Sequence, residues 1–409
     1  MNVIIVGGGI VGLALGLLCK RHNIPCEIYE AAPEITELGV GITLLPHAMR
    51  ELRELGLQDQ LEELGIENKE SCFFNRFGQL IYEEPRGRFA GYPIPELGIH
   101  RGKLHLSLYQ EAIKELGRDK IHTGHQCVQV EQDDRSATAT FVNSLTNEPI
   151  HRATGDVVVG CDGINSTVRK HFYPDESVVF SGINTWRGVT RHKPILTGKS
   201  YLRIGSIRTG KMVIYPIIDD YDDAGNQLIN WMAEIETPDV TRNDWNRPGK
   251  IDDFYSIYGE WVFDWLDVTK LIKNAEKILE YPMVDKDPVA RWSFERITLA
   301  GDAAHPMYPR GSNGSAQGLI DARVLSDFLV KEEPIAALKK YENERLAPTS
   351  RIIETNRKNP PDFINIRVEE LTGDKPFVIL EDFITKHELR EMSDRYKEIA
   401  GFSLNKVST

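Results

Sequence analysis

The chain has 409 residues, of which 41% are apolar and 27% charged, and a formal net charge of −12. This charge argues against a general binder of nucleic acids or anionic membranes, because both require a basic face. The five cysteines contain no C-x-x-C pair, so neither a disulfide framework nor a zinc or other metal site is predicted. No window reaches roughly 18 uninterrupted apolar residues, and the N-terminus lacks a basic region and a cleavage site. We therefore expect a cytoplasmic protein without stable membrane insertion.

The first elements along the chain form a recognisable unit. Residues 2–6 predict a buried strand, 12–22 a helix with an apolar face, and 26–30 a second strand. This order is a βαβ unit, which implies a parallel sheet and a right-handed crossover. Further elements are predicted in chain order: a helix at 101–117, strands at 156–160 and 297–300, and helices over 316–350 and 385–400.

Two intervening stretches have a different character. Residues 71–99 and 181–289 are rich in β-branched and aromatic residues and alternate in segments such as Lys211–Ile217. They predict a separate, mainly antiparallel sheet. The predicted organisation is therefore an α/β, Rossmann-like domain made of 1–70, 100–180 and 290–350, a β-sheet domain of 71–99 and 181–289 inserted into it, and a C-terminal helical segment of 351–409.

The first motif is a G-x-G-x-x-G turn at Gly7, Gly9 and Gly12. The first glycine permits the tight turn, the second lets backbone approach a pyrophosphate, and the third lets helix and strand pack closely. The phosphates then meet the positive end of the helix. Glu30, at the end of the next strand, lies where a carboxylate accepts both ribose hydroxyls of an adenosine. The motif predicts a dinucleotide site without separating NAD from FAD.

The second motif separates them. Gly301-Asp302 follows a predicted strand, so its carboxylate lies at the carboxyl edge of the sheet. There it can accept a hydrogen bond from a ribityl hydroxyl, a group that FAD has and NAD lacks. The loop 309–314 then leads into a helix whose N-terminus can direct N–H groups at the flavin ring, where negative charge develops on reduction. FAD is therefore the predicted cofactor of the Rossmann-like domain.

The third motif is Asp162-Gly163, within the segment 160–166. With all three motifs in this order, the chain resembles the class A, para-hydroxybenzoate-hydroxylase-like FAD monooxygenases over about residues 2–350. Within that family, the segment 301–322 is similar to the phenazine-hydroxylating branch that forms pyocyanin. Arg310 departs from that pattern, because the related sequences carry a small or apolar residue there.

The resemblance implies an activity and a set of contacts. It implies NADH or NADPH as reductant, O2 as co-substrate, and hydroxylation of an aromatic small molecule through a flavin C4a-hydroperoxide. Arg101 matches the family's R-x-x-L-x-x-x-L arginine and is expected to touch FAD. The predicted cofactor-binding residues are Gly7, Gly9, Ile10, Val11, Gly12, Glu30, Ala31, Gly41, Ile42, Arg101, Cys127, Val128, Asp162, Gly163, Gly301, Asp302, Gly311, Ser312, Asn313 and Gly314.

Candidates for the substrate pocket come mainly from the second sheet and from the residues in and just before the loop 309–314. Tyr215, Trp231 and Tyr308 are candidates for an aromatic slot, His47 for its edge, and Pro306 and Pro309 for the flavin side. Arg187 and Arg203 are candidates for bidentate binding of a substrate carboxylate. Each of these side chains also suits an ordinary structural role, and no catalytic acid or base is predicted.

Three other functions compete with this interpretation. A flavin-dependent halogenase requires a W-x-W-x-I-P stretch, and a dithiol flavoprotein reductase requires a close cysteine pair; the sequence has neither. A non-catalytic flavin sensor stays open, as do a monomeric or homodimeric state and the choice between NADH and NADPH.

Overall fold

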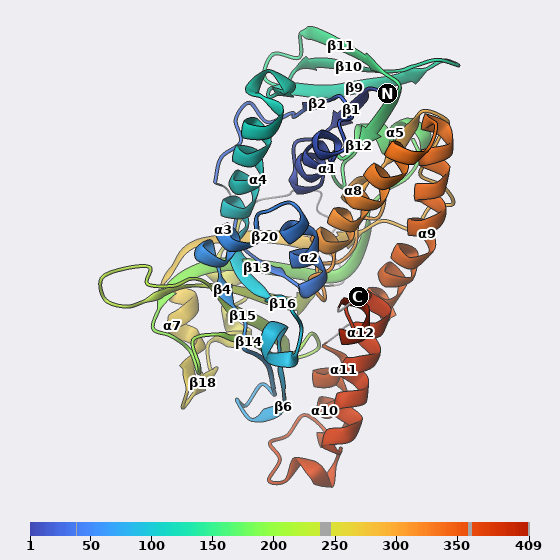
Figure 1. Cartoon of the computed structure of the whole chain (residues 1–409). Helices are drawn as coiled ribbons and strands as arrows, with labels where there is room; N and C mark the ends of the chain where they lie inside the picture. Colours follow the sequence, from blue (N-terminus) through green and yellow to red (C-terminus); the bar gives the residue numbers. More distant parts are fainter. Residues whose placement is uncertain (38, 238–246, 359–361, 408–409) are drawn as a thin grey trace.

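The computed structural model describes residues 1–37, 39–237, 247–358 and 362–407. Within them the chain forms a parallel sheet and a larger, mainly antiparallel sheet, and long helices run along one side of both (Figure 1). The predicted α/β fold class with an additional antiparallel sheet is confirmed. The predicted ranges 181–289 and 351–409 each include residues outside the described ones.

The parallel sheet has the strand order β21-β12-β1-β2-β8. Its strands are β1 (Val3–Val6), β2 (Cys26–Tyr29), β8 (Ile121–His122), β12 (Val157–Gly160) and β21 (Ile297–Leu299). Four of them lie within the ranges predicted from sequence. Strand order reverses beside β1, and in such sheets ligands bind at the carboxyl ends of the strands at this switch point. Helix α1 (Ile10–Arg21) begins two residues earlier than predicted, and α4 (Arg101–Leu116) matches its prediction.

Two smaller sheets and several short helices complete this part of the molecule. A three-stranded sheet contains β9 (His125–Gln132), β10 (Ala137–Asn143) and β11 (Pro149–Gly155). A second contains β3 (Gly41–Leu44), β7 (Leu97–His100) and β4 (Ile66–Glu67). The short helices are α2 (Pro46–Glu54), α3 (Gln58–Leu64) and α5 (Thr167–Phe172).

The larger sheet has the order β17-β20-β13-β16-β15-β14-β5-β6. Its strands are β5 (Glu70–Phe74), β6 (Leu80–Pro85), β13 (Val179–His192), β14 (Ser200–Ser206), β15 (Gly210–Ile218), β16 (Gln227–Glu236), β17 (Arg247–Pro248) and β20 (Ala275–Asp285). All neighbours are antiparallel except β14 and β5, which join the two sequence stretches by a parallel pairing. Both faces of its central strands are buried, because one packs against helices and the other against the parallel-sheet part.

One part of the predicted strand region is helical. Residues 251–273 include α6 (Tyr255–Tyr258) and α7 (Val268–Lys273), beside a two-stranded ribbon of β18 (Val262–Phe263) and β19 (Leu266–Asp267). Val268, Leu271 and Ile272 are fully buried and follow helical spacing. Together with Phe254 they pack against Trp231 of β16 and cover one face of the larger sheet.

The C-terminal helices run from the parallel sheet to the far end of the molecule (Figure 1). They are α8 (Gly314–Lys331), α9 (Pro334–Lys358), α10 (Phe363–Thr372), α11 (Lys386–Ala400) and α12 (Leu404–Val407). The stretch 316–350, predicted to be helical, contains most of α8 and the first part of α9. The second helix begins at Pro334, because proline suits the first position of a helix.

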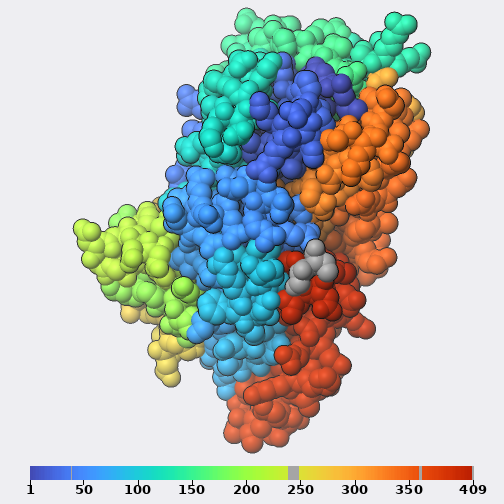
Figure 2. All heavy atoms as spheres, viewed as in Figure 1, coloured from blue at the N-terminus to red at the C-terminus, as the bar shows by residue number. Residues whose placement is uncertain are grey.

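The C-terminal segment packs against the body of the protein. In Figure 2 this segment, in red, lies against the blue-to-cyan stretch that includes β6. Tyr92 donates a hydrogen bond to the carbonyl of Phe402 at 2.6 Å, and Lys397 pairs with Glu84 at 2.7 Å.

None of the described helices is long and apolar enough to cross a membrane. In the same residues, no group of three or more His, Cys, Asp and Glu side chains is arranged to hold a metal ion.

Candidate active site

The glycine turn lies between β1 and α1. Gly7 has φ +108°, and a Cβ there would come within 2.4 Å of the Cys161 carbonyl oxygen. A Cβ on Gly12 would lie 1.9 Å from the Gly7 oxygen, whereas a Cβ on Gly9 would meet nothing within 4 Å. The first and third glycines therefore permit close packing, and the middle one faces open space. No side chain caps the N-terminus of α1, so its N–H groups are available to a phosphate.

Glu30 lies directly after β2 and turns back to the glycine turn. Its carboxylate accepts hydrogen bonds from the backbone N–H of Gly8 at 2.6 Å and of Ala32 at 2.7 Å. These two contacts fix the carboxylate at the edge of the turn, beside Ala31.

Asp302 lies at the end of β21, in the short turn Gly301–Ala303. Its side chain is accessible to solvent but has protein around it, and this burial raises the pKa of the carboxyl group. The charges of His305 and Arg101 oppose the rise. A Cβ on Gly314 would lie 3.7 Å from the Asp302 carboxylate. The structure therefore brings Asp302, Arg101 and the start of α8 together, although they come from distant parts of the sequence.

The third motif is adjacent to the first. The Asp162 carboxylate accepts hydrogen bonds from the N–H groups of Thr167 and Val168 through one oxygen, at 2.8 and 3.2 Å. Its other oxygen is buried and has no partner, and burial raises the pKa of the group. Gly163 has φ +74° and faces open space.

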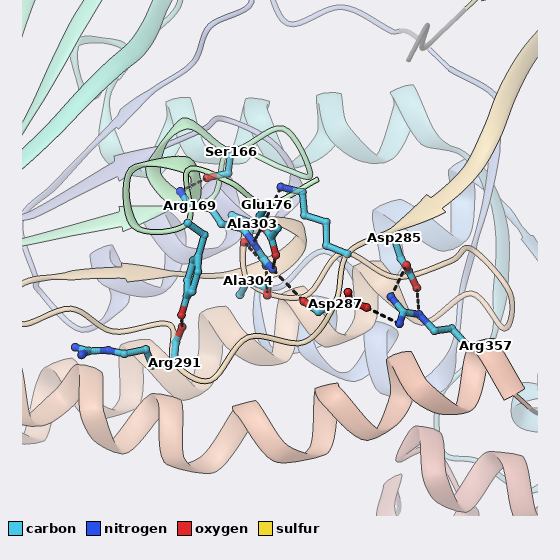
Figure 3. Close-up of polar contacts among 11 residues, drawn as sticks. Ser166, Arg169, Glu176, Asp285, Asp287, Arg291, Ala303, Ala304 and Arg357 are labelled. Atoms are coloured by element: carbon cyan, nitrogen blue, oxygen red, sulfur yellow. Dashed lines mark hydrogen bonds and ion pairs between the residues drawn. The ribbon is translucent and has the colours of Figure 1, made fainter. Parts of the chain in front are cut away.

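A buried arginine joins this motif to the turn after β21 (Figure 3). Arg169 forms an ion pair with Glu176 and donates to the carbonyls of Ala303 at 3.1 Å and Ala304 at 2.6 Å. It also donates to the Asp287 carbonyl at 3.2 Å. Sequence analysis did not predict this role, because the three carbonyl groups that Arg169 binds lie more than 100 residues along the chain.

A second ionic contact, made by a residue of α8, supports the same turn. His305 pairs with Asp321, whose carboxylate also accepts from the Gly301 N–H at 3.0 Å and from Arg345 at 2.7 Å. Asp321 and Arg345 are buried, and an ionisable residue on the apolar face of α8 is the one sequence signal that could have revealed this contact.

The flavin loop, residues 309–314, has an unusual backbone. Gly311 has φ +89° and Ser312 has φ +57°. Arg310 donates to the Asp362 carboxylate at 2.8 Å, and the Asn313 amide donates to the Tyr396 hydroxyl at 2.7 Å. Asn313 is the N-cap residue of α8, but its side chain makes no capping hydrogen bond.

The remaining predicted cofactor contacts lie around these motifs. Val11 packs against Gly301, and the Gly41 N–H donates to Asn230 at 2.8 Å. Burial, reinforced by Asp162, raises the pKa of Cys127 to about 12, whereas the next residue, Val128, is exposed. Ile10 and Ile42 are partly buried against the same core.

Three of the predicted pocket residues share one face of the larger sheet. Arg203 pairs with Val213 on the neighbouring strand, and Val213 pairs with Met232. Met232 in turn pairs with Arg187. Directly paired residues point to the same face of a sheet, so both arginines lie on this face. Tyr215 lies two residues from Val213 on the same strand and therefore on the same face.

Trp231 lies on the opposite face. Its indole is fully buried and donates to the Thr190 hydroxyl at 3.0 Å. Gly188 makes room for this ring, since a Cβ there would lie 2.3 Å from it. Trp231 therefore does not form an aromatic slot with Tyr215, which corrects that part of the predicted pocket.

The two arginines have no carboxylate partner among the described residues. Arg203 donates to the Ser71 hydroxyl, and its guanidinium lies 4.5 Å from the ring centroid of Tyr201 and 4.8 Å from that of Phe73. The guanidinium of Arg187 lies 5.7 Å from the ring centroid of Tyr281. Its Nε is buried without a hydrogen-bond partner.

The other pocket candidates have different surroundings. His47 is buried without a partner for either ring nitrogen, and burial and Arg50 lower its pKa to about 3, so the ring is neutral. Tyr308 packs with Ile183 and Met283. Pro306 is buried, whereas Pro309 is exposed.

These features fit FAD. Four features converge at the carboxyl ends of the parallel strands. They are the N-termini of α1 and α8, which have no side-chain caps, Gly9, which faces open space, and the unpartnered carboxylate oxygen of Asp162. Together they match the pyrophosphate, the ribityl chain and the flavin ring in chemical type.

Comparison with known proteins points the same way. Residues 1–197 and 277–356 match a family described as an FAD binding domain. The chain is 35% identical to phenazine 1,6-dicarboxylic acid hydroxylase PhzS of Lysobacter antibioticus, over 87% of this chain and 89% of that protein. It is 27% identical to 3-hydroxybenzoate 6-hydroxylase of Polaromonas naphthalenivorans, over 88% and 87%.

Solved structures share the fold. A salicylate hydroxylase substrate complex matches with a TM-score of 0.75 at 19% identity, over 100% of this chain and 97% of that one. Klebsiella pneumoniae HpxO with FAD and uric acid matches with a TM-score of 0.75 at 21% identity, over 100% and 96%. The chain therefore belongs to the FAD-binding-domain family of class A flavoprotein monooxygenases, and it is an aromatic hydroxylase that uses FAD, NAD(P)H and O2.

Proposed function

We propose that the substrate is a planar aromatic molecule with a carboxylate, phenazine-like or another heteroaromatic acid. The observation that carries this proposal is the pair Arg187 and Arg203, two cations on one sheet face without a carboxylate partner among the described residues. A guanidinium binds a carboxylate through two parallel hydrogen bonds. The names of the relatives, which include a phenazine dicarboxylic acid hydroxylase and a hydroxybenzoate hydroxylase, support the same class.

The cofactor would be held by the residues predicted from sequence. The glycine turn would bind the pyrophosphate, Glu30 the adenosine ribose, Asp302 the ribityl chain, and the N-terminus of α8 the flavin ring. When bound, FAD supplies the redox chemistry that uses NAD(P)H and O2 to place one oxygen atom on an aromatic ring.

The substrate would bind between the sheet face and the flavin loop. Arg203 and Gly311 line the same small cavity, with a volume of about 20 Å³. This space suits a single water, so the aromatic side chains around it would move to admit a ring. Tyr201 and Phe73 offer flat faces for a planar substrate, and a held carboxylate would fix which ring carbon faces the flavin.

Several further properties are part of this proposal. Residues 1–70, 100–180 and 290–350 would form the FAD-binding domain, 71–99 and 181–289 the substrate domain, and 351–409 a C-terminal helical segment. The enzyme would act in the cytoplasm on a small molecule, as a monomer or homodimer, without binding nucleic acid.

The experiment that tests the substrate class compares acid and amide forms of one ring. A panel of aromatic acids is screened for stimulation of NADH and NADPH oxidation, with the product detected by mass. For the best substrate, the acid should give more product per NAD(P)H consumed than its amide. Arg203→Lys should lower this coupling even where binding survives, because lysine keeps the charge and loses the planar fork.

Arg191→Lys is the matched control for that variant. Arg191 lies on β13 as Arg187 does, but it is exposed and pairs with Glu276. Its replacement should leave coupling unchanged. Equal coupling for acid and amide would remove the carboxylate from the proposal and leave both arginines with structural roles.

Replacing Asp302 by alanine should weaken FAD binding. The carboxylate would lose a charge-assisted hydrogen bond, which contributes about 1.5–3 kcal/mol, or roughly a 10- to 150-fold change in affinity. The dissociation constant is measured by flavin fluorescence. The control is Asp327→Ala, which removes a partly exposed carboxylate of α8 that pairs with Arg323. Unchanged affinity in Asp302→Ala would mean that this carboxylate does not contact FAD.

A further inference from the structure

The cavity at Arg203 is too small for the proposed substrate. Its volume of about 20 Å³ suits a single water, and an aromatic acid needs far more space. Part of its wall belongs to the larger sheet and part to the C-terminal segment, which contributes Ser393, Tyr396, Lys397 and Phe402. An aromatic acid can therefore reach Arg203 only where part of this wall moves.

A much larger groove lies on the outer side of one part of the wall. It lies between β6, the edge strand of the larger sheet, and α11, and has a volume of about 650 Å³. Glu84 of β6 and Lys397 of α11 line both the groove and the cavity. The ring centroid of Tyr82, in the groove, lies 5.9 Å from that of Phe73, in the cavity. One layer of side chains therefore separates the two spaces.

The Glu84–Lys397 ion pair can open without leaving either charge unpaired. The Glu84 carboxylate accepts hydrogen bonds from the Lys397 ammonium and the Ser393 hydroxyl, each at 2.7 Å. It also lies 3.4 Å from the Arg86 guanidinium, and the ammonium lies 3.3 Å from Asp394. If Lys397 moves away, Glu84 keeps its other two partners and the ammonium keeps Asp394. An unpaired buried charge, the main cost of breaking such a contact, is thereby avoided.

Another ion pair of the same wall is less able to move. Arg86 also lines the cavity and pairs with Glu96 at 2.8 Å, and both side chains are buried. Moving Arg86 would take this cation from a carboxylate that is fully enclosed by protein. The Lys397 side chain is 19% exposed, and its ammonium is carried on a flexible stem. Of these two cations, Lys397 therefore moves at the lower cost.

The groove has the size and the chemistry of a site for an aromatic anion. Small-molecule sites have volumes of about 300–1,000 Å³, and the rings of Tyr82 and Tyr92 line this groove. Apart from the ion pairs just described, the described residues of the groove include two exposed cations, Lys386 and Arg390, and one exposed acid, Glu83. An incoming anion therefore meets a net positive charge before it reaches the ion pair.

We propose that this groove is the entry site of the aromatic-acid substrate, and that the Glu84–Lys397 ion pair is the gate between the groove and the Arg203 cavity. While the gate is open, the substrate carboxylate takes the place of Glu84 beside the Lys397 ammonium, and it then moves on to the Arg203 guanidinium. Lys397 lies beyond residue 356, where the match to the FAD binding domain family ends. The inference rests on the proposed function, because it takes Arg203 as the destination of the substrate.

The first test measures how fast phenazine-1-carboxylate enters the full-length holoenzyme. Binding is followed by stopped flow through the change in flavin absorbance, in the wild type and in Lys397→Ala. The variant removes the ammonium and the stem that close the gate. The association and dissociation rate constants should both rise, by about 10- to 150-fold, the equivalent of one charge-assisted hydrogen bond. The dissociation constant should stay nearly the same, because Arg203 holds the bound carboxylate.

The second test needs no substrate. Iodide quenches flavin fluorescence when it collides with the ring, and Gly311 of the flavin loop lines the cavity behind the gate. The quenching constant of bound FAD should therefore rise in Lys397→Ala. The loss of a cation would by itself lower the local concentration of iodide, so a rise reports the opening of the wall.

Arg395→Ala is the matched control for Lys397→Ala. Arg395 is an exposed cation of the same helix, but it lines neither the groove nor the cavity. Its replacement should leave the rate constants and the quenching constant unchanged. If Lys397→Ala does not fold, Glu84→Gln takes its place, because it keeps the shape of the carboxylate and removes the charge that holds Lys397. Glu84→Gln should shift the same quantities in the same direction by a smaller factor.

Three results would overturn the proposal: an unchanged quenching constant in Lys397→Ala, an equal rise in Arg395→Ala, or weaker binding of phenazine-1-carboxylate at an unchanged association rate. The last result would show that Lys397 holds the bound substrate instead of admitting it. If phenazine-1-carboxylate does not bind to the wild type, the iodide measurement decides alone. Failure of the aromatic-acid proposal shows in the coupling of acid and amide, which neither test measures, so the two failures are distinguishable.

Discussion

Replacing Asp362 by asparagine should lower the free energy of unfolding by about 3–5 kcal/mol, the range observed when one partner of a buried ion pair is removed. The Asp362 carboxylate accepts from Arg310 at 2.8 Å and lies 3.2 Å from the Lys211 ammonium, which also pairs with Glu234 at 2.7 Å. All four side chains are buried. Without the carboxylate, two buried cations would share a single acid.

The pKa of Asp362 supports this expectation. Burial alone would raise it, but the charges of Lys211 and Arg310 outweigh burial and hold it well below its usual range. A lowered folded-state pKa gives stability that is complete above the unfolded pKa of about 3.9 and lost only as pH falls through the folded value. The deficit of Asp362→Asn should therefore stay constant from about pH 5 to pH 8 and shrink in stronger acid.

Asp374→Asn is the matched control for Asp362→Asn. It makes the same change in the same C-terminal segment, at a partly exposed carboxylate that pairs with Arg76 at 2.8 Å. Such a pair contributes about 0–1 kcal/mol. Urea unfolding of the three proteins decides the matter, and an equal loss in both variants would show that the buried network is not the cause. Adding Arg310→Met to Asp362→Asn should recover part of the loss, because the unpaired cation is removed.

Local patterns were sufficient to predict the parts of the site that depend on neighbouring residues. Gly7, Gly9 and Gly12 determine a turn within six residues, and Gly301-Asp302 lies at the end of a strand that is fully buried. In these cases the residue type, its spacing and the preceding strand together restrict the backbone, so sequence alone indicated where each group would lie.

The contacts that hold the flavin loop could not be predicted in this way. Asp362 lies 52 residues from Arg310, and Tyr396 lies 83 residues from Asn313. A single aspartate or tyrosine in a C-terminal segment carries no periodic signal, and Arg310 was visible only as a departure from the family pattern. Its role becomes clear once the fold brings an acid beside it.

The sequence also could not show which face of the larger sheet each side chain occupies. Alternation along a strand separates two faces, but β16 is buried on both from Gln227 to Glu234. Hydrophobicity therefore could not show which face meets the flavin. Residue type alone places Trp231 and Tyr215 in one aromatic group. Strand register separates them, because Trp231 pairs with Ile214 rather than with Tyr215.

Replacing Arg169 by methionine should cost about 3–5 kcal/mol of unfolding free energy and should also weaken FAD binding. Arg169 is fully buried and joins α5, after the Asp162-Gly163 motif, to the turn that carries Asp302 (Figure 3). Methionine fills much of the same volume but leaves the carbonyls of Ala303 and Ala304 without their donor. Unsatisfied buried carbonyls would displace this turn, and with it Asp302.

Glu176 determines how much of that loss can be recovered. Burial disfavours its charged form, but Arg169 and Lys286 outweigh burial and lower its pKa. In Arg169→Met only Lys286, at 3.2 Å, still compensates the carboxylate. Adding Glu176→Gln should therefore restore part of the unfolding free energy, while FAD binding should stay weak because the two carbonyls still lack a donor.

Arg296→Met is the control for the carbonyl contacts of Arg169. Arg296 also donates to backbone carbonyls, those of Asp134 and Asp156, but it is partly exposed and lies away from the flavin motifs. Water can replace its hydrogen bonds, so we expect a loss of about 1 kcal/mol or less and unchanged FAD affinity. Urea unfolding of each variant is measured with and without added FAD, since ligand binding stabilises the folded state in proportion to its affinity. If Arg169→Met keeps full stabilisation by FAD, then Arg169 supports the fold alone and the position of Asp302 does not depend on it.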